Sequence, residues 1–320
     1  MRQSLAGSRF SRATGPRRAR APPGWRGLGG GPDPNRRIVI LRNISESVRI
    51  DRMAILADSG KPRTAQAADW ALSRGIASMT TAEVSLMLNA PVSQVPQRLS
   101  AAKLRGEWIT PARGLWIPVP PEFRGWSGPP ATEFIAALMS HLKADYYVGW
   151  LAAASLYGAT HHAPQVTHVA TSRLVRERQV GRARLVFHER SSLVDLPVVE
   201  RMARSGAFRV STPEVTALDV ASDIFLAGGL DNAATVIADL ADEVGLDGQT
   251  LGSLAPKFAD AAVRRVGWMV ERFTGHRLDR LAEYVARISS APSRLHPALP
   301  LTGSVDTRWG LRLNAPVEVE

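Results

Sequence analysis

The sequence predicts an α+β fold, in which a small N-terminal domain precedes a larger mixed α/β domain that ends in an all-helical part. Three observations predict it. Two short helical patterns and a β-prone hairpin follow one another within residues 80–118, strand and helix patterns alternate from residue 131, and only helical patterns remain within residues 213–289. At 320 residues, the chain is long enough for two domains with separate cores.

Composition excludes several classes of protein. The chain has no cysteine, which rules out disulfides, thiolate zinc sites and cysteine nucleophiles. Its longest charge-free apolar run, residues 146–159, is too short to span a bilayer, and the arginine-rich N-terminus lacks the apolar segment of a secretory signal. We therefore expect a cytoplasmic protein that makes no membrane contact.

The net charge of +11 is unevenly distributed. Residues 1–52 contain 12 basic and 3 acidic residues among many glycines and prolines, so they are predicted to be a disordered basic leader. Residues 61–128 contain 8 basic and 4 acidic residues, whereas residues 129–320 contain 20 and 21. Beyond the leader, the modest basic excess therefore falls on the first folded segment.

This segment predicts a helical pair. Residues 64–74 form a first helix that ends at Gly75. Thr80 and Glu83 have the spacing of a capping box, which begins the next helix, and Asn89-Ala90-Pro91 ends it because proline disfavours helical geometry in the residue before it. The apolar face of this helix is expected to comprise Val84, Leu86, Met87 and Leu88.

A third helix and a hairpin complete the pattern. Ser93 is expected to cap the third helix, and Gly106 to close it. The β-prone runs 108–110 and 115–118 flank a Pro-Ala-Arg-Gly turn. The residues expected on the buried side of the third helix are Val95, Leu99, Ala102 and Leu104. This order is that of a winged helix-turn-helix, so we predict such a domain at residues 61–118.

The other side of the third helix is polar and suits double-stranded DNA. Glutamine can pair bidentately with adenine and arginine with guanine, while small side chains allow close approach to the groove. Lys103, and Arg113 at the hairpin tip, suit phosphates. The alternative is a solvated helix face or a protein contact. The candidate DNA-binding residues are Ser93, Gln94, Gln97, Arg98, Ala101, Lys103, Arg105 and Arg113.

The remaining chain divides into a Pro/Gly-rich linker at residues 119–130, a C-terminal domain at 131–290 and a loosely attached tail at 291–320. Thr212-Pro213-Glu214 is a strong helix start. The expected strands are residues 166–171 and 183–188. The expected helices are residues 131–142, 149–157, 213–226, 231–244, 256–273 and 277–289.

No catalytic or metal site is predicted. His161, His162, His168 and His188 lack a metal-ligand spacing and are expected to be structural. Glu177-Arg178-Gln179 weakly resembles the acidic-x-Lys/Gln element of metal-dependent nucleases, but no partner aspartate precedes it on a strand. We therefore expect a protein that is not an enzyme and has no cofactor.

Residues 61–290 resemble the AbiEi-type antitoxins of bacterial type IV toxin–antitoxin (abortive-infection) systems. The resemblance rests on phrases in a family-like order: LSAAKLRGEWITPARGLWIPVP, YYVGWLAAASLYGATHHAP, VTHVATSR, VSTPEVTALDVA and GGLDNAATVIADLADE. The chain departs from the family where relatives carry an arginine in the STPER phrase, since Val215 stands there.

The resemblance implies a cytoplasmic repressor whose winged helix binds inverted repeats in its own promoter, with two protomers paired on the DNA. The C-terminal domain would counter a cognate nucleotidyltransferase-like toxin encoded beside it, without a need for a stable complex. Two alternatives stay open: a DNA-binding regulator that has no toxin partner, and a winged-helix nuclease that uses Glu177.

Overall fold

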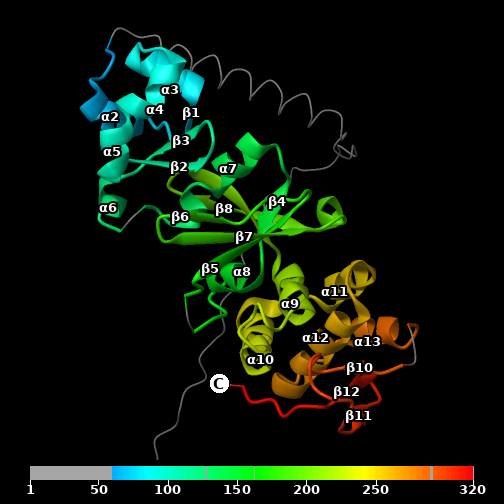
Figure 1. The fold of residues 1–320 in the computed structure, drawn as a ribbon. Helices are drawn as coiled ribbons and strands as arrows, with labels where there is room; N and C mark the ends of the chain where they lie inside the picture. Colours follow the sequence, from blue (N-terminus) through cyan, green and yellow to red (C-terminus); the bar gives the residue numbers. More distant parts are fainter. Residues whose placement is uncertain (1–59, 127, 162, 289–290, 320) are drawn as a thin grey trace, which may run out of the picture. The chain divides into compact units, whose positions relative to one another are not determined.

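The computed structural model describes residues 60–126, 128–161, 163–288 and 291–319. It confirms the α+β class and the all-helical part near the C-terminus (Figure 1). The leader predicted at residues 1–52 lies outside the described residues. Among the helices of the described ranges, none is both long and apolar enough to cross a membrane.

The first described region combines short helices with a three-stranded antiparallel sheet of order β1-β3-β2. Its elements are, in order, η1 (Thr64–Gln66), α2 (Ala67–Ser73), β1 (Met79–Thr80), α3 (Thr81–Leu88), η2 (Val92–Gln94), α4 (Val95–Arg98), α5 (Ser100–Leu104), β2 (Trp108–Ala112) and β3 (Leu115–Pro118). We call β2 and β3 with their connecting turn the wing hairpin.

Local capping determines how α3 begins and ends. The Thr80 Oγ1 accepts from the Glu83 N–H at 3.3 Å, and the Glu83 Oε2 accepts from the Thr80 N–H at 2.6 Å, which confirms the predicted capping box. At the other end, Asn89 adopts a left-handed conformation with φ 47°, which ends the helix before Pro91.

The third predicted helix differs from the expectation. It begins as the 3₁₀ turn η2, whose N-cap is Pro91, so Ser93 lies inside the turn and is not the cap. It is then interrupted at Leu99, where ψ is 0°, between α4 and α5. Pro96 lies in the first turn of α4, where its missing N–H removes no helical hydrogen bond.

Apolar side chains from these helices pack on the paired indoles of Trp108 and Trp116, whose ring centroids are 6.4 Å apart. The expected core residues that are buried are Val84, Met87, Leu88, Val95, Leu99 and Ala102. Two expectations were wrong, because Leu86 is 45% exposed and Leu104 is 90% exposed. Leu104 lies two helical turns after Gln97 and therefore shares its exposed side.

The mixed domain is built on a six-stranded sheet of order β6-β7-β5-β4-β9-β8, in which β5 pairs with β7 and β4 with β9 in parallel. The strands are β4 (Tyr146–Val148), β5 (Val166–Thr171), β6 (Arg178–Val180), β7 (Ala183–Glu189), β8 (Val198–Ala203) and β9 (Gly206–Ser211). The accompanying helices and turns are α6 (Pro121–Arg124), η3 (Ala131–Glu133), α7 (Ile135–Leu142), α8 (Trp150–Leu156) and η4 (Leu193–Asp195). The predicted strands 166–171 and 183–188 are confirmed as β5 and β7.

The two faces of this sheet belong to different cores, as strand geometry requires. Val148 and Val169 pack with α7, whereas the adjacent Tyr147 and Ala170 pack with the helical part. Figure 1 shows α7 on one side of the sheet and α9 and α10 on the other. The short strand β4 therefore connects both cores.

The helical part follows β9 directly. Its first helix begins at Thr212, whose side chain accepts from the Val215 N–H at 3.4 Å, as the sequence predicts. Its helices are α9 (Pro213–Ser222), α10 (Leu230–Asp239), the π-helical η5 (Leu240–Gly245), α11 (Gly248–Leu254), η6 (Ala255–Lys257), α12 (Asp260–Phe273) and α13 (Asp279–Val285).

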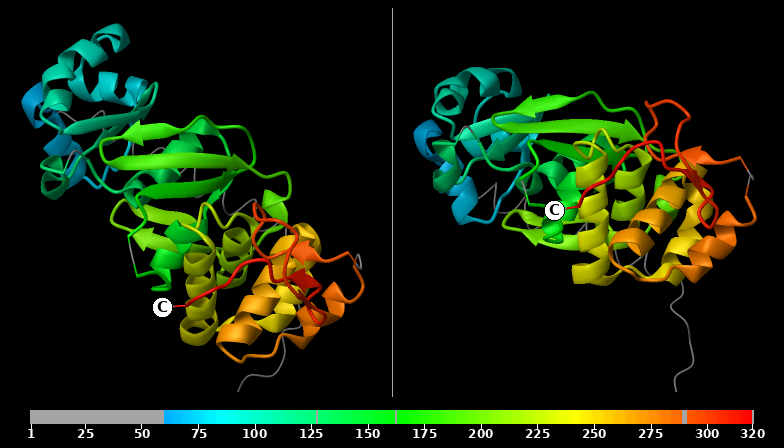
Figure 2. Two further views of the ribbon diagram at one scale, coloured as in Figure 1. Left: turned by 60° about the horizontal axis from the view of Figure 1, so that its bottom comes forward. Right: turned by 90° about the horizontal axis from the view of Figure 1, so that it is seen from below.

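The C-terminal segment was expected to be loosely attached, but it packs on the helical part. It forms a small sheet of order β10-β12-β11, from Ser293–Arg294, Leu311–Arg312 and Val305–Asp306. Trp309 is 1% exposed, and Arg264 of α12 donates to the Gly310 carbonyl at 2.5 Å. Figure 2 shows this red segment running along the helices. A buried indole and a buried arginine thus fix a segment whose composition suggests a coil.

Candidate nucleic-acid interface

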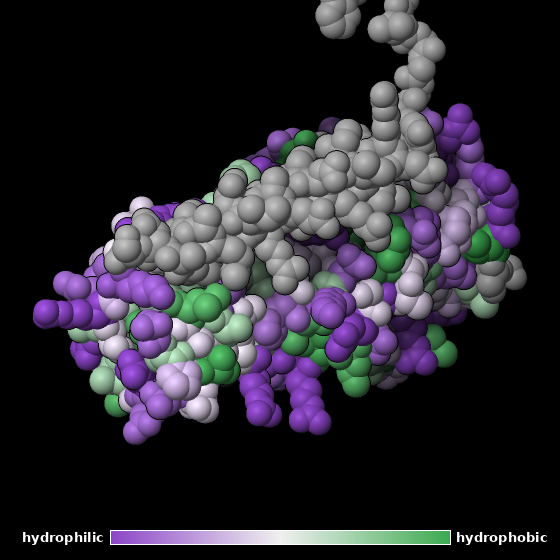
Figure 3. Space-filling model, turned by 90° about the horizontal axis from the view of Figure 1, so that it is seen from above, coloured by the Kyte–Doolittle hydropathy of each residue, from purple (hydrophilic) through white to green (hydrophobic). Residues whose placement is uncertain are grey.

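All eight candidate DNA-binding residues are exposed. Gln94, Gln97, Arg98 and Ala101 recur at three- and four-residue intervals from η2 to α5, so they share one side of this helical stretch, opposite the buried Val95 and Leu99. In Figure 3, hydrophilic side chains intermingle with smaller hydrophobic areas over the described surface. The polar side has no described segment of the chain packed over it.

Arg98 keeps its charge available. Its Nη2 donates to the Gln94 Oε1 at 3.2 Å, one helical turn earlier. Since the amide is neutral, the contact orients the guanidinium without compensating its charge. This pair presents one bidentate donor group and one amide side by side, the two groups that read guanine and adenine edges.

Arg105 differs from Arg98 because an acidic residue compensates it. Its Nε and Nη2 donate to the two Glu107 oxygens at 2.7 and 3.1 Å, and this hydrogen bonding raises the pKa of Arg105. Of the candidate set, Arg105 is therefore the arginine least suited to bind a phosphate.

A groove of about 480 Å³ separates the third helix from the wing hairpin. Val92, Pro96 and Lys103 line its helical side, and Thr110 and Arg113 line its hairpin side. The Lys103 Nζ donates to the Thr110 Oγ1 at 2.7 Å and so ties the two sides together. The groove thus has one cationic side chain on each wall.

Contacts with the mixed domain hold the wing hairpin. The His141 Nε2, on α7, donates to the Arg113 carbonyl at 3.0 Å, and the Arg178 Nη1, on β6, donates to the Pro111 carbonyl at 3.0 Å. Sequence reasoning missed both residues. Their partners are backbone carbonyls of a distant segment, which leave no residue pattern to detect.

A second polar constellation lies inside the mixed domain. The buried Asp219 accepts from the Arg190 Nη2 at 2.8 Å, and Arg190 also donates through Nη1 to the Tyr147 hydroxyl at 2.7 Å. Burial outweighs the arginine and raises the pKa of Asp219 to about 6, and burial also raises the pKa of Tyr147. Val215 is fully buried in the helical core beside this region. The position where relatives carry an arginine is therefore a packing position here.

Two of the four histidines form a buried pair. The His168 Nδ1 lies 2.9 Å from the His188 Nε2, and the His188 ring lies 4.6 Å from the Trp150 ring. Burial, with a contribution from His188, lowers the pKa of His168 to about 4. His161 lies 3.7 Å from Asp239, and His162 lies outside the described residues. The buried pair is thus neutral at physiological pH.

The nuclease-like fragment is engaged in other contacts. The Arg184 Nε donates to the Glu177 Oε1 at 2.5 Å, and this bond lowers the pKa of Glu177. Within the described ranges, no three acidic or histidine residues are grouped as a metal site would require. Glu177 therefore has an arginine partner where a nuclease would need carboxylates around a metal.

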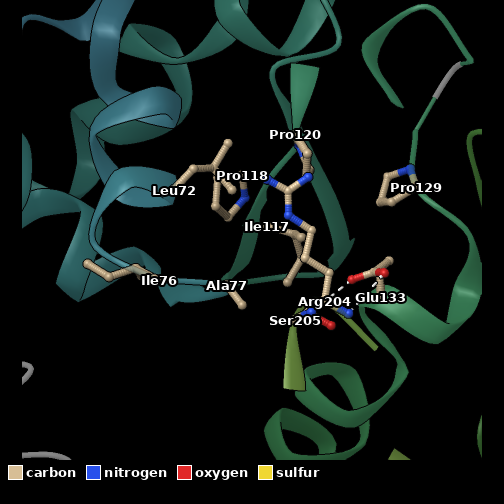
Figure 4. A pocket seen from close by; sticks show the side chains of 11 residues that line it. Leu72, Ile76, Ala77, Ile117, Pro118, Pro120, Pro129, Glu133, Arg204 and Ser205 are labelled. Atoms are coloured by element: carbon tan, nitrogen blue, oxygen red, sulfur yellow. Dashed lines mark hydrogen bonds between the residues drawn. The ribbon is translucent and has the colours of Figure 1, made fainter. Parts of the chain in front are cut away.

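A cavity of about 130 Å³ lies where the first region meets the mixed domain. Figure 4 shows Leu72 and Ile76 on one side of it and Glu133 on the other. The two carboxylate oxygens of Glu133 accept from the Arg204 and Ser205 N–H groups at 3.3 and 2.9 Å. With this carboxylate already paired, the cavity offers mainly apolar walls.

Comparison with known proteins identifies the mixed and helical parts. Residues 147–271 match the family model of the AbiEi antitoxin C-terminal domain. This stretch contains the Tyr147–Arg190–Asp219 constellation and supports an antitoxin role. Among solved structures, the chain is similar to the RV2827C protein from Mycobacterium tuberculosis, with a TM-score of 0.58 and 15% identity over 80% of this chain and 92% of that one. This likeness concerns the fold. No curated protein matches the sequence.

Proposed function

We propose that the protein is a DNA-binding antitoxin that represses its own operon and counteracts a nucleotidyltransferase-like toxin encoded beside it. The match of residues 147–271 to an antitoxin domain is the observation that carries the antitoxin half. The exposed polar side of η2, α4 and α5, next to the wing hairpin, supports the DNA-binding half. The protein acts in the cytoplasm, without catalysis or a cofactor.

In this proposal, residues 61–118 are a winged helix-turn-helix. Gln94, Gln97 and Arg98 enter the major groove, while Lys103 and Arg113, on the two walls of the groove beside the wing, hold phosphates. Each matched base contact contributes about 1–3 kcal/mol of discrimination. Two protomers pair on inverted repeats of the promoter, since half-sites related by a two-fold axis require two copies of the reading helix.

A gel-shift on the region upstream of the protein's own gene tests the DNA-binding half. The change Arg98→Ala removes a base contact, so it should weaken binding to that region roughly 5- to 150-fold and binding to scrambled DNA far less. Arg272→Ala, on an exposed arginine of α12, is the matched control and should leave both affinities unchanged. Equal losses on both DNAs would reduce Arg98 to a phosphate contact. A wild type without sequence preference would overturn the repressor proposal.

Co-expression with the neighbouring gene tests the antitoxin half. Induction of that gene alone should arrest growth, and co-expression of this protein should restore it. Arg98→Ala should restore growth as well as the wild type, because the substitution lies outside the matched antitoxin domain. If the wild type binds its promoter but restores no growth, the protein is a regulator without a toxin partner.

A further inference from the structure

The six-stranded sheet ends in an arginine-rich hairpin that the proposed function leaves without a role. We call residues 173–184 the arginine hairpin; they comprise the segment before β6, the strand itself and the start of β7. This stretch contains five arginines and one acidic residue, Glu177, in a region where residues 129–320 are otherwise nearly balanced in charge. Glu177 pairs with Arg184, which leaves four arginines without a carboxylate from within the hairpin.

The arginine hairpin adjoins the wing hairpin. Strand β6 is an edge strand of its sheet and packs against β2. Arg178 spans the contact, since its Nη1 donates to the Pro111 carbonyl at 3.0 Å. Pro111 lies two residues before Arg113 at the wing tip. The proposed DNA-binding surface therefore continues from the wing onto the edge of the mixed domain.

Three of these arginines are available to a ligand. Arg173, Arg176 and Arg182 are exposed, and none of them forms an ion pair with a described residue. The Arg182 guanidinium lies 5.8 Å from the Trp126 ring, a contact that orients the side chain but leaves its charge uncompensated. Uncompensated guanidinium groups are donors suited to phosphate oxygens.

We infer that the arginine hairpin is a second DNA contact, which binds the phosphates of the duplex beyond the segment reached by the wing. The inference rests on the proposed function. It adds a sequence-independent contact from the antitoxin domain, so that the domain matched at residues 147–271 takes part in operator binding. Charge complementarity is the argument for DNA as the occupant: the duplex carries a negative charge at about every 1.7 Å of its axis.

The competing explanation is protection of an edge strand. Charged side chains along an exposed edge discourage pairing with another chain, and β6 is such an edge. In that case the arginines would act on solubility alone, and their removal would leave the affinity for DNA unchanged. The two explanations therefore differ in a measurable quantity.

The test is the salt dependence of binding by the full chain to a duplex of its own upstream region. The double variant Arg176→Ala/Arg182→Ala should lower the slope of log K against log salt by about 1.8, since each lost phosphate contact removes about 0.9. The advantage of the wild type over the variant should then shrink roughly tenfold between 50 and 200 mM salt. Specific and scrambled duplexes should be affected alike. The control is Arg272→Ala/Arg287→Ala, which removes the same charge from the helical part.

The outcomes separate this inference from the proposed function. If the wild type binds its upstream region and the double variant has the same slope, the arginine hairpin is not a DNA contact, and the repressor proposal stands. If the control changes the slope as much as the double variant, only net charge matters and the inference fails. If the wild type shows no preference for its upstream region, the proposed function itself fails. A smaller slope confined to the double variant, with unchanged discrimination between sequences, supports the inference.

Discussion

Attachment of the C-terminal segment can be tested by adding one methyl group. Gly267 lies in the interior of α12, directly beneath Trp309. A Cβ built at this position would overlap the six-membered ring of that tryptophan. Backbone atoms of a 14-residue helix cannot yield easily, so Gly267→Ala should force the indole out of its site.

The free-energy cost follows from what the indole loses. Trp309 is almost fully buried, and its Nε1 donates to the Glu271 Oε2 at 3.1 Å. Loss of a large buried aromatic side chain costs about 3–5 kcal/mol. Replacement of glycine by alanine inside a helix returns about 1 kcal/mol. The free energy of unfolding of the helical part should therefore fall by roughly 2–4 kcal/mol.

Urea unfolding followed by circular dichroism measures this loss, and Gly252→Ala is its control. Gly252 lies inside α11, but the nearest atom to its added Cβ, the Arg280 Cβ, is 3.5 Å away, an ordinary contact. This variant should be neutral or more stable by up to about 1 kcal/mol. Equal stabilities for the two variants would refute the idea that Trp309 is part of the core. Growth rescue by Gly267→Ala then reports whether the antitoxin activity needs the attached segment.

Two further predictions concern the buried groups of the mixed domain. Asp219→Ala leaves Arg190 half-buried without its carboxylate and should lower the free energy of unfolding by about 3 kcal/mol in urea titrations, whereas Asp219→Asn, which keeps an acceptor, should cost less. His168 has its pKa lowered to about 4, so its contribution to stability is lost as the pH falls from about 6.5 to 4; the raised pKa of Asp219, about 6, acts in the opposite direction. Relative to wild type, His168→Gln should therefore gain up to about 3 kcal/mol of stability between pH 6.5 and pH 4, measured by urea titrations at both values, and a constant difference would contradict this assignment.

Local rules predicted the parts of the fold that depend on neighbouring residues. The capping boundary at Thr80 and the start of α9 at Thr212 depend on side chains three residues apart, which a sequence displays directly. Strand β5 likewise appeared as a β-branched run bounded by turns. The interruption at Leu99 was invisible, since the flanking residues all favour a helix, and the exposure of Leu104 follows from the resulting change of phase.

Contacts between distant segments were beyond reach for a different reason. Asp219 stands at a position that reads as an ordinary polar residue of a helix, and its burial makes sense only beside Arg190, which lies on another element. The bonds from His141 and Arg178 to carbonyls of the wing hairpin are of the same kind. Because any residue offers a carbonyl, no pattern of residue types marks such a partner.

These wing contacts bear on how the two proposed activities are related. A winged helix joined to an antitoxin domain by a linker alone would change its orientation freely, and binding of one ligand would not affect the other domain. Here Arg178 and His141 fasten the wing hairpin to the sheet and to α7, on both sides of the wing turn. Arg178 also belongs to the arginine hairpin. A single side chain thus joins the surface proposed to bind DNA to the domain proposed to oppose the toxin, so any movement of the wing on DNA must be accommodated within β6 of the antitoxin domain.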